Sequence, residues 1–348
     1  MHVATLARAL RSRGVDVCVL DIGRGDHVGP GVTQARGRVR FTAQLARVTW
    51  ERRIVHVHTS GANLKSWLVA LASSRARWPG GPRPLLTIHS GLAPDYLDAR
   101  RRRRRMAKKI CSRFGHVLAA SPGVAGALGR AGVPRALVSV EPAFLAAQVA
   151  PGEPPRPLQV FRAAHAPIFC AALAPTATYG EDLLVEAFQA VRQRLPRAGL
   201  VVFGRGSDRG HAAALMETVG HTGGVLALGE IEHGVALAVM AACEVFVRAT
   251  RADGDALSVR EALALGRIVV ASAAGHRPHG CLLFGVGDAA ELARRMMEAS
   301  HLAEVGGGPA LPVRDSLERV LDVYRSLALG RPIPSDSAHL AQLSCWTR

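Results

Sequence analysis

The sequence has no long hydrophobic run. Its most apolar stretch, Val235 to Val247, contains Cys243 and Glu244 and falls short of the roughly 18 apolar residues that a membrane-spanning helix requires. Residues 1–14 show helical spacing with scattered arginines and lack the apolar core and cleavage pattern of a secretory signal. These absences predict a soluble protein of the cytoplasm, with peripheral contact to the inner face of a membrane as an open alternative.

Paired cysteines are also missing. The six cysteines are dispersed, with no C-x-x-C pair and no histidine at zinc-finger spacing, so reduced thiols and no metal site are expected. His56 and His58 alternate along one predicted strand and share a face. Without a third ligand they are interpreted as packing or polar-pocket residues.

Acidic residues are scarce in the first half of the chain. Residues 1–150 hold 25 Lys or Arg against 7 Asp or Glu, whereas residues 151–348 hold 19 against 20. Much of the excess is one run, Arg100, Arg101, Arg102, Arg103, Arg104, Arg105, Lys108 and Lys109. This run is either a solvated helix face or a surface for an anionic acceptor, a membrane or nucleic acid. Aromatic residues make up only 5% of the chain, so stacking platforms are few and nucleic acid is disfavoured.

Apolar strand-like segments alternate with helical ones along the whole chain. The predicted strands are 15–23, 54–60, 84–91, 116–121, 136–144, 168–174, 199–204, 225–229, 244–250 and 268–272. The predicted helices are 3–13, 64–74, 97–114, 122–130, 181–194, 209–219, 233–242, 256–265, 287–303 and 311–329. Continuous apolar strands between helices predict parallel sheets covered on both faces. A length of 348 residues predicts two such doubly wound, Rossmann-like α/β domains.

A proline-rich segment marks the boundary between the two predicted domains. Five prolines between residues 151 and 167 disfavour regular structure, and the charge balance changes at the same place. We therefore predict an N-terminal domain at 1–150, a linker at 151–167 and a C-terminal domain at 168–310. A C-terminal helix at 311–329 and a loosely held tail at 330–348 follow.

The segment from Thr250 to Ser272 carries the most informative pattern. A loop rich in Gly and Asp leads into a helix whose early backbone N–H groups are unpaired, which is a ready site for a phosphate or diphosphate. Glu261 lies about one turn inside that helix, and the loop should open at the carboxyl edge of a sheet, where open α/β sheets bind ligands. The alternative is an ordinary helix start in which Asp253 and Asp255 are only caps and dipole partners.

This segment resembles the donor-binding motif of retaining GT-B glycosyltransferases, of the group 1 or family 4-like kind. There two acidic residues enclose seven others and the second lies in E-A-x-A-x-G, a spacing that Asp253 and Glu261 have here. The resemblance implies that Glu261 holds the ribose hydroxyls of a nucleotide-sugar and that Asp253 contacts the transferred sugar. It places further donor-binding residues at Asp255, Ala256, Leu257, Ser258, Gly204 and Arg205.

The resemblance extends over most of the chain. Residues 2–20 are similar to the family's first helix and second strand, and residues 85–91 to the strand whose histidine faces the transferred sugar. His89 is therefore implied to be a catalytic-site residue. Gly204, Gly206 and Gly210 are one residue off the dinucleotide fingerprint, so no nicotinamide cofactor is predicted.

Two departures from the family pattern stand out. The basic pair that usually neutralises the donor diphosphate is absent, with Ala174 and Tyr179 near its positions; Arg248, Arg251 and Arg205 are candidate substitutes. The family's first strand is also absent, which predicts an unfilled central position in the first domain and indicates an incomplete sequence or an altered acceptor pocket.

The resemblance implies transfer of a sugar from a nucleotide-sugar to a glycan or lipid-linked acceptor with retention, in polysaccharide or glycoconjugate biosynthesis. The donor is a substrate, and no further cofactor or metal is implied. The alternatives are a non-catalytic relative, a basic nucleic-acid-binding protein and a nucleotide-sugar epimerase.

Overall fold

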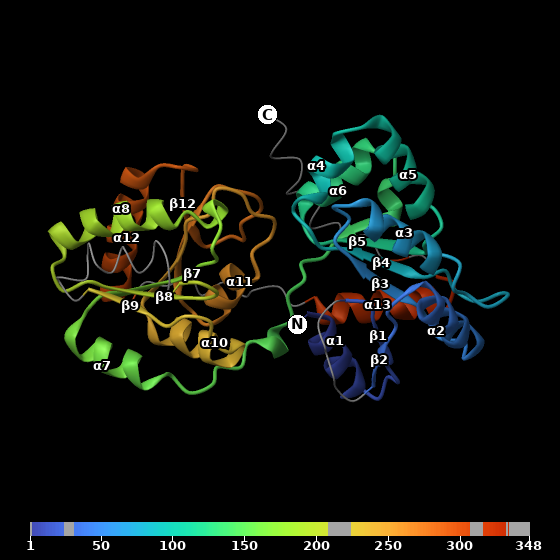
Figure 1. The fold of residues 1–348 in the computed structure, drawn as a ribbon, viewed down its shortest axis with the longest axis horizontal. Coiled ribbons are helices and arrows are strands. Elements are labelled where there is room, and N and C mark those ends of the chain that lie inside the picture. Colours follow the sequence, from blue (N-terminus) through green and yellow to red (C-terminus); the bar gives the residue numbers. More distant parts are fainter. Residues whose placement is uncertain (1, 24–30, 208–223, 307–315, 332, 334–348) are drawn as a thin grey trace. The chain divides into compact units, whose positions relative to one another are not determined.

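The computed structural model describes residues 2–23, 31–207, 224–306, 316–331 and 333. It divides into two compact units, which we call the first unit (residues 1–145 and 315–348) and the second unit (residues 146–314) (Figure 1). The predicted helix at 209–219 and nearly all of the predicted tail lie outside the described residues.

The second unit is built on a six-stranded parallel sheet. Its strands are β7 (Ile168–Ala172), β8 (Gly199–Phe203), β9 (Val225–Ala227), β10 (Val245–Arg248), β11 (Ile268–Ser272) and β12 (Cys281–Phe284). Their spatial order is β12-β11-β10-β7-β8-β9, so the chain runs outward to one edge, returns to the centre and runs to the other edge. This is the doubly wound order, and its direction reverses between β7 and β10.

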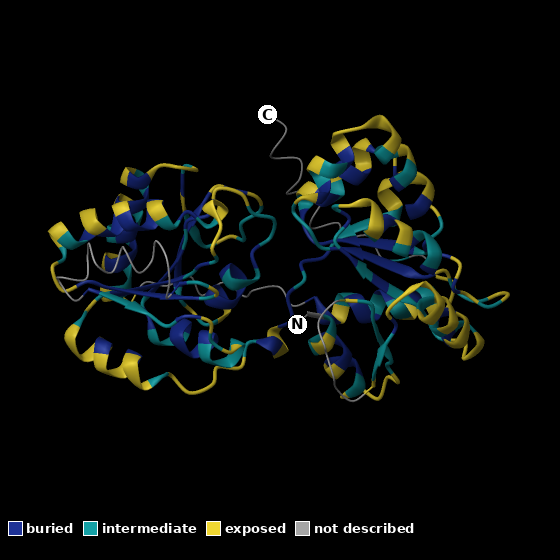
Figure 2. Ribbon diagram, viewed as in Figure 1, coloured by how far each residue is buried: buried dark blue, intermediate teal, exposed yellow. Residues whose placement is uncertain are grey.

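Helices cover both faces of this sheet. Apolar residues of α8 (Glu181–Arg194) and α12 (Ala289–Glu304) share one core cluster with alternate strand residues. Those of α7 (Arg156–Ala164), α10 (His233–Ala242) and α11 (Leu257–Ala264) share the other. The inner strands β7, β8, β10 and β11 are therefore mostly buried, whereas the edge strands β9 and β12 are mainly half-buried (Figure 2).

The prediction of an irregular segment at 151–167 is wrong. The structure has α7 in this stretch, with Pro155 at its N-cap and Pro157 in its first turn. Proline is tolerated there because the first N–H groups of a helix have no intrahelical partner. Leu158 and Phe161 are buried against the second unit, so the segment belongs to that unit's core.

The first unit contains a four-stranded parallel sheet in sequential order. Its strands are β3 (His56–Thr59), β4 (Leu85–Ile88), β5 (His116–Ala119) and β6 (Val138–Val140). One core cluster joins the sheet to α3 (Leu64–Ser73), α4 (Ala93–Asp98), α5 (Arg101–Cys111) and α6 (Pro122–Arg130). The opposite cluster contains α1 (His2–Arg11) and the C-terminal α13 (Leu317–Ala328). The described part of the predicted helix at 311–329 is α13, which thus belongs to the first unit; residues 311–315 lie outside the described residues.

A separate two-stranded sheet completes the first unit. It pairs β1 (Val19–Asp21) with β2 (Val32–Gln34), and α2 (Arg38–Trp50) follows. Among the described residues, no strand joins β1 or β2 to the four-stranded sheet. Neither β2 nor α2 was predicted from the sequence.

Candidate functional site

The reversal of strand order in the second unit creates a natural ligand site. Two loops leave the carboxyl ends of the neighbouring strands β7 and β10, one over residues 173–180 and one over residues 249–256. The loops are tied together, because the Arg251 N–H donates to the Thr178 carbonyl at 2.8 Å. The Arg248 guanidinium also lies 4.7 Å from the centre of the Tyr179 ring. Open α/β sheets bind ligands at this point of the topology.

Asp253 lies in the second of these loops, between two arginines. Its Oδ2 accepts hydrogen bonds from Arg248 Nε at 3.0 Å and from Arg277 Nη1 at 3.2 Å, and Thr250 donates to the same atom. Burial opposes ionisation of the carboxyl, but the two arginines outweigh it and hold the pKa of Asp253 below its usual value. Asp253 is therefore a carboxylate with a fixed orientation.

Arg277 is a site residue that the sequence analysis missed. Its side chain is only 3% exposed, and it also donates to the Ser272 carbonyl and the Thr250 hydroxyl. It comes from the loop after β11, which reaches the 250–256 loop because Gly275, with φ of 72°, has no side chain to collide with the Asp253 and Gly254 carbonyls. A lone arginine in a loop carries no local signal of this role.

Asp255 is paired as well. Arg260 donates to both of its oxygens, at 2.8 and 2.9 Å, and both side chains are buried. The N-cap position of α11 is Ala256, which makes no side-chain cap bond. The alternative in which Asp253 and Asp255 cap this helix is therefore wrong. Leu257 and Ser258 open α11, where the first N–H groups have no intrahelical partner.

Glu261, unlike Asp253 and Asp255, forms no ion pair with an arginine among the described residues. Its buried Oε1 lies 3.4 Å from Gln148 Nε2 and 3.3 Å from His233 Nε2. Burial raises the pKa of Glu261 to about 7, against a smaller opposing effect of the Gln148 bond. His233 Nε2 and Gln148 Oε1 have no hydrogen-bond partner among the described residues. Gln148 and His233, which the sequence analysis also missed, leave two buried polar atoms for a ligand to satisfy.

The other predicted donor residues differ in their surroundings. Arg251 is engaged by Asp182 through two hydrogen bonds of 2.8 and 2.6 Å. Arg205 is exposed and lies 3.6 Å from an exposed Glu230 carboxylate. Gly204, with φ of 113°, ends β8 where a side chain would collide with the Leu173 carbonyl, so its backbone position requires glycine. Arg248 is thus the predicted arginine that lies closest to the motif's first acid.

His89 belongs to the first unit, at the carboxyl end of β4. Its Nε2 lies 2.9 Å from His58 Nδ1, and its ring is stacked on that of His58. The His56 and His58 rings are 4.0 Å apart, so these two residues share a face as predicted. No group of three or more His, Cys, Asp or Glu that could hold a metal ion occurs in the described part of the chain.

The basic run forms α5 and its N-cap residue. Arg103 stacks on Tyr96 and donates to its carbonyl, and Arg104 is half-buried. The remaining basic residues of the run are exposed: Arg100, Arg101, Arg102, Arg105, Lys108 and Lys109. None of the described helices has the length and apolar character that crossing a membrane requires.

Two sequence models of glycosyltransferase families match the chain. Glycosyltransferase Family 4 matches residues 1–144, and Glycosyl transferases group 1 matches residues 165–301. The second match covers β7 to α12, including the loop with Asp253 and the helix with Glu261. No curated protein matches the sequence significantly.

Solved structures of similar architecture cover nearly the whole chain. Anabaena Alr3699/HepE in complex with UDP and glucose is 19% identical, with a TM-score of 0.68 over 93% of this chain and 95% of that one. Sucrose-phosphate synthase of Thermosynechococcus elongatus is 21% identical, with a TM-score of 0.59 over 99% and 93%. A putative UDP-N-acetylglucosamine 2-epimerase of Listeria monocytogenes is 16% identical, with a TM-score of 0.64 over 96% and 95%. The likeness confirms the predicted fold of two Rossmann-like α/β domains with parallel sheets.

Proposed function

We propose that this chain, whose two halves match the Glycosyltransferase Family 4 and Glycosyl transferases group 1 models, transfers a sugar from UDP-sugar to a glycan or lipid-linked acceptor with retention of configuration. The observation that carries the proposal is the buried Glu261 carboxyl on α11, close to Gln148 Oε1 and His233 Nε2, two buried polar atoms that make no hydrogen bond among the described residues. UDP is favoured as the nucleotide because the HepE structures contain UDP or UDP-glucose.

A ribose ring supplies what the Glu261 cluster lacks. Two vicinal hydroxyls donate hydrogen bonds to a carboxylate, and hydroxyl oxygens accept from amide and imidazole N–H groups. Such a ligand would stabilise the ionised form of Glu261 and provide hydrogen-bond partners for Gln148 Oε1 and His233 Nε2. The donor ribose therefore belongs at Glu261 in this proposal.

The diphosphate belongs beside Arg248 and the start of α11. Arg248, Arg277 and Asp253 together carry one net positive charge, which compensates for the neutral Ala174 and Tyr179. Arg248 stacks on Tyr179, so it brings its charge to a position where the family has a basic residue. The free N–H groups of the first turn of α11 add partial positive charge. Stabilisation of the leaving diphosphate is then largely electrostatic.

Asp253 retains one oxygen for the transferred sugar. Its Oδ2 is taken up by Arg248, Arg277 and Thr250, while Oδ1 accepts from the Gly254 N–H at 3.0 Å. A carboxylate oxygen has room for a second donor, such as a sugar hydroxyl. We propose that Asp253 both fixes Arg248 and orients the sugar through Oδ1.

The first unit supplies the acceptor side of the proposal. The exposed cations of α5 suit an acceptor with an anionic group, such as a lipid diphosphate. His89, held by His58, is proposed to face the transferred sugar. Positioning of donor and acceptor, with electrostatic stabilisation, carries the transfer in this scheme. A lipid-linked acceptor would place the reaction at the cytoplasmic face of a membrane, in glycoconjugate or polysaccharide synthesis.

Calorimetric titration with UDP, GDP and ADP tests the donor site. We expect the wild-type protein to bind UDP most tightly and Glu261→Ala to lose at least about tenfold in affinity, since a buried hydrogen-bonded charge contributes more than 1.4 kcal/mol. Glu186→Ala, which removes an exposed glutamate of α8, is the control and should bind as wild type. A folded wild-type protein that binds none of the three nucleotides contradicts the proposal.

The missing basic pair also favours a second candidate, a non-catalytic relative that binds the nucleotide-sugar without turnover. Ala174 and Tyr179 are the observation behind it. Product analysis with UDP-sugars separates the possibilities: a glycosylated acceptor supports transfer, an epimerised sugar supports an epimerase, and binding without any product supports the relative.

A further inference from the structure

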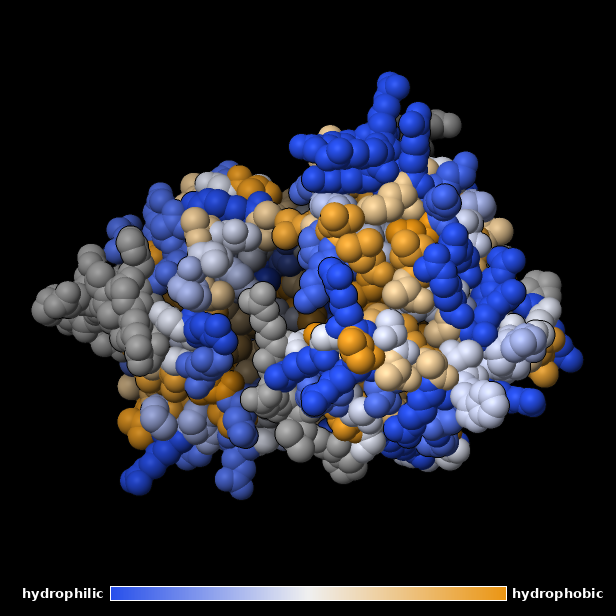
Figure 3. All heavy atoms as spheres, turned by 45° about the vertical axis from the view of Figure 1, so that its right-hand side comes forward, coloured by the Kyte–Doolittle hydropathy of each residue, from blue (hydrophilic) through white to orange (hydrophobic). Residues whose placement is uncertain are grey.

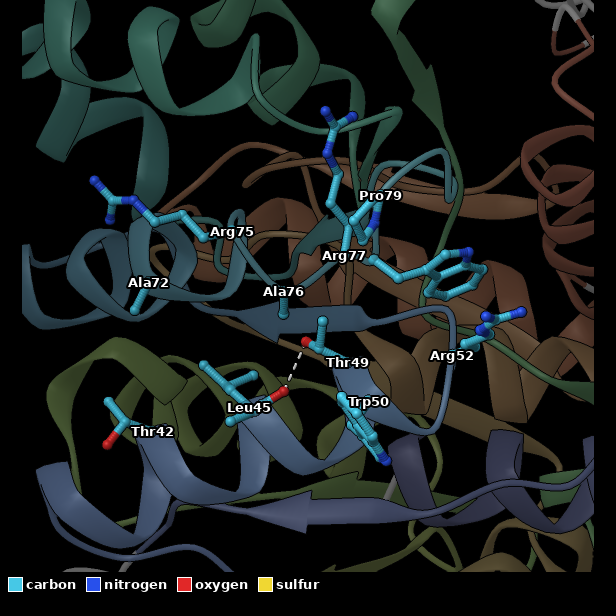
Figure 4. Close-up of a pocket in the computed structure, with 12 residues that line it drawn as sticks. Thr42, Leu45, Thr49, Trp50, Arg52, Ala72, Arg75, Ala76, Arg77 and Pro79 are labelled. Carbon is cyan, nitrogen blue, oxygen red and sulfur yellow. Dashed lines mark hydrogen bonds between the residues drawn. The ribbon is translucent and has the colours of Figure 1, made fainter.

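The first unit is hollowed between α2 and the chain that follows α3. This groove has a volume of about 990 Å³. One wall is a single face of α2, whose members recur at helical spacing from Thr42 through Leu45 to Trp50. The other wall runs from Ala72, near the end of α3, to Pro79 (Figure 4). The donor site and the basic helix α5 contribute nothing to it.

Three arginines surround this groove without acidic partners. Arg52, Arg75 and Arg77 are among its lining residues, which include no Asp or Glu. Among the described residues, none of the three forms an ion pair. By contrast, Arg47 and Arg53 nearby are both paired with Glu51. The groove therefore presents uncompensated positive charge to an anion.

Large apolar side chains are exposed on the two helices beside these arginines. On α2, Trp50 is 89% exposed and Val39, about three turns away on the same face, is 82% exposed. On α3, Leu64 and Leu68 lie one turn apart and are 54% and 53% exposed. Figure 3 shows hydrophobic residues gathered on the face of this unit that the view brings forward, with hydrophilic ones around them. Exposed apolar groups of this kind mark interaction surfaces.

We propose that the α2–α3 face of the first unit docks on a bilayer that contains anionic lipids. Trp50 and the leucines of α3 would enter the interfacial layer, where tryptophan is preferred. Arg52, Arg75 and Arg77 would bind lipid phosphates, and their aliphatic stems would stay in contact with apolar groups. This docking goes beyond the proposed transfer reaction and does not depend on it.

The composition of the groove favours a bilayer over a soluble anionic glycan. Binding sites for sugars need side chains that accept and donate hydrogen bonds to many hydroxyls, usually carboxylates and carboxamides. Apart from its arginines and the indoles of Trp50 and Trp78, the groove offers only the hydroxyls of Thr42 and Thr49, which already donate to carbonyls of their own helix. Its lining residues Leu45, Ala46, Ala72 and Ala76 are apolar. A lining of cations and apolar groups without carboxylates suits an amphiphile with an anionic head.

Helix α5 is the competing surface, and it differs in one respect. It carries more cations than the groove, but none of the exposed large hydrophobic residues in the described chain lies on it. Charge alone gives weak binding that salt screens, whereas apolar insertion adds a contribution that persists at high salt. The two surfaces can therefore be separated by matched substitutions.

The test is co-sedimentation of the full chain with vesicles of phosphatidylcholine, with and without phosphatidylglycerol. One variant combines Arg52→Gln, Arg75→Gln and Arg77→Gln; its control combines Arg101→Gln, Arg102→Gln and Arg105→Gln, with the same loss of charge. We expect binding to require phosphatidylglycerol, to fall at least about tenfold in the groove variant and to change less than about threefold in the control. Trp50→Ala alters only an exposed side chain. It should weaken vesicle binding and reduce the fraction of that binding that persists at high salt.

Thermal unfolding and UDP binding of each variant show whether its fold is kept. UDP binding reports on the donor site alone, so loss of that activity with vesicle binding intact would count against the proposed function and leave the docking standing. The docking proposal is overturned if wild type ignores anionic vesicles, if the α5 control loses as much binding as the groove variant, or if Trp50→Ala binds unchanged. Binding of a soluble polyuronate that the groove variant abolishes, without vesicle binding, would also overturn it.

Discussion

The second unit and the first unit hold their arginines in different ways. Around the loop at 249–256, Arg248 and Arg277 share Asp253, Arg260 holds Asp255, and Arg251 holds Asp182. In the first unit, the exposed cations of α5 and the groove arginines mostly have no carboxylate beside them in the described structure. Paired arginines fix the geometry of a loop, whereas unpaired arginines produce a positive electrostatic potential that attracts an anionic partner.

Glu261 is the exception that gives the second unit its chemistry. In a loop region where the acids are paired with arginine, it alone is buried beside neutral groups, and its pKa is raised to about 7. The arginine pairs hold the surrounding backbone in place, and the Glu261 carboxyl is left able to bind a ligand. The arginine–carboxylate pairs are thus accompanied by one buried carboxyl, Glu261, that has no charged partner of this kind. Carboxyls with a strongly shifted pKa are common in functional sites.

The largest expected effect comes from breaking a pair in the second unit. Arg277→Met removes a buried cation that bonds to Asp253, Thr250 and Ser272, so Asp253 loses half of its compensation. Removal of one partner of a buried ion pair typically costs about 3 to 5 kcal/mol, and we expect unfolding in urea to show a loss of that order. Arg294→Met, at an exposed pair on α12, should cost less than about 1 kcal/mol. Equal losses in the two variants would contradict the contrast between buried and exposed arginines.

A smaller effect is expected from Glu261 and depends on pH. The folded chain holds the Glu261 proton up to about pH 7, whereas the unfolded chain releases it near the ordinary value of 4.5, so stability falls as pH rises through this window. Glu261→Gln cannot ionise and should match wild type near pH 4.5 but exceed its stability at pH 8, by up to about 3 kcal/mol. Urea denaturation at both pH values measures the difference.

The control for this pH effect is Glu186→Gln on the exposed side of α8. It should follow the wild-type stability curve at both pH values, because its side chain is exposed and the substitution leaves the buried Glu261 cluster unchanged. A Glu261→Gln advantage that is the same at pH 4.5 and pH 8 would show that ionisation of Glu261 is not its cause.

The smallest effect is expected at an exposed pair of the second unit. Arg205→Ala breaks only a 3.6 Å contact with Glu230 in which both side chains are largely exposed. Its stability should change by less than about 0.5 kcal/mol. UDP binding then decides the role of this arginine: an unchanged affinity leaves Arg248 as the substitute for the missing basic pair, and a clear loss assigns the diphosphate to Arg205.

Some elements escaped prediction for identifiable physical reasons. The helix α2 begins after Gly37 without a side-chain cap, and arginines interrupt its apolar pattern. The helix α7 was hidden by prolines that in fact occupy its N-cap and first turn. The strand β12 is short and only half-buried, so it lacks the continuous apolar signal of its neighbours. In all three cases the local sequence pattern is weak or misleading, and packing in the folded chain determines the element that forms.

The sequence by itself determined the alternation of strands and helices, the doubly wound sheet of the second unit and the spacing that brings Asp253 and Glu261 onto one loop and helix. Those features depend on side-chain periodicity and on residues close together in the chain. Only the tertiary structure decided that Asp253 lies between Arg248 and Arg277, that Gln148 and His233 flank Glu261, and that three arginines without carboxylate partners surround an apolar groove. Most of these contacts, such as that of Gln148 with Glu261, join residues far apart in sequence, so no local pattern predicts which charges will be neutralised.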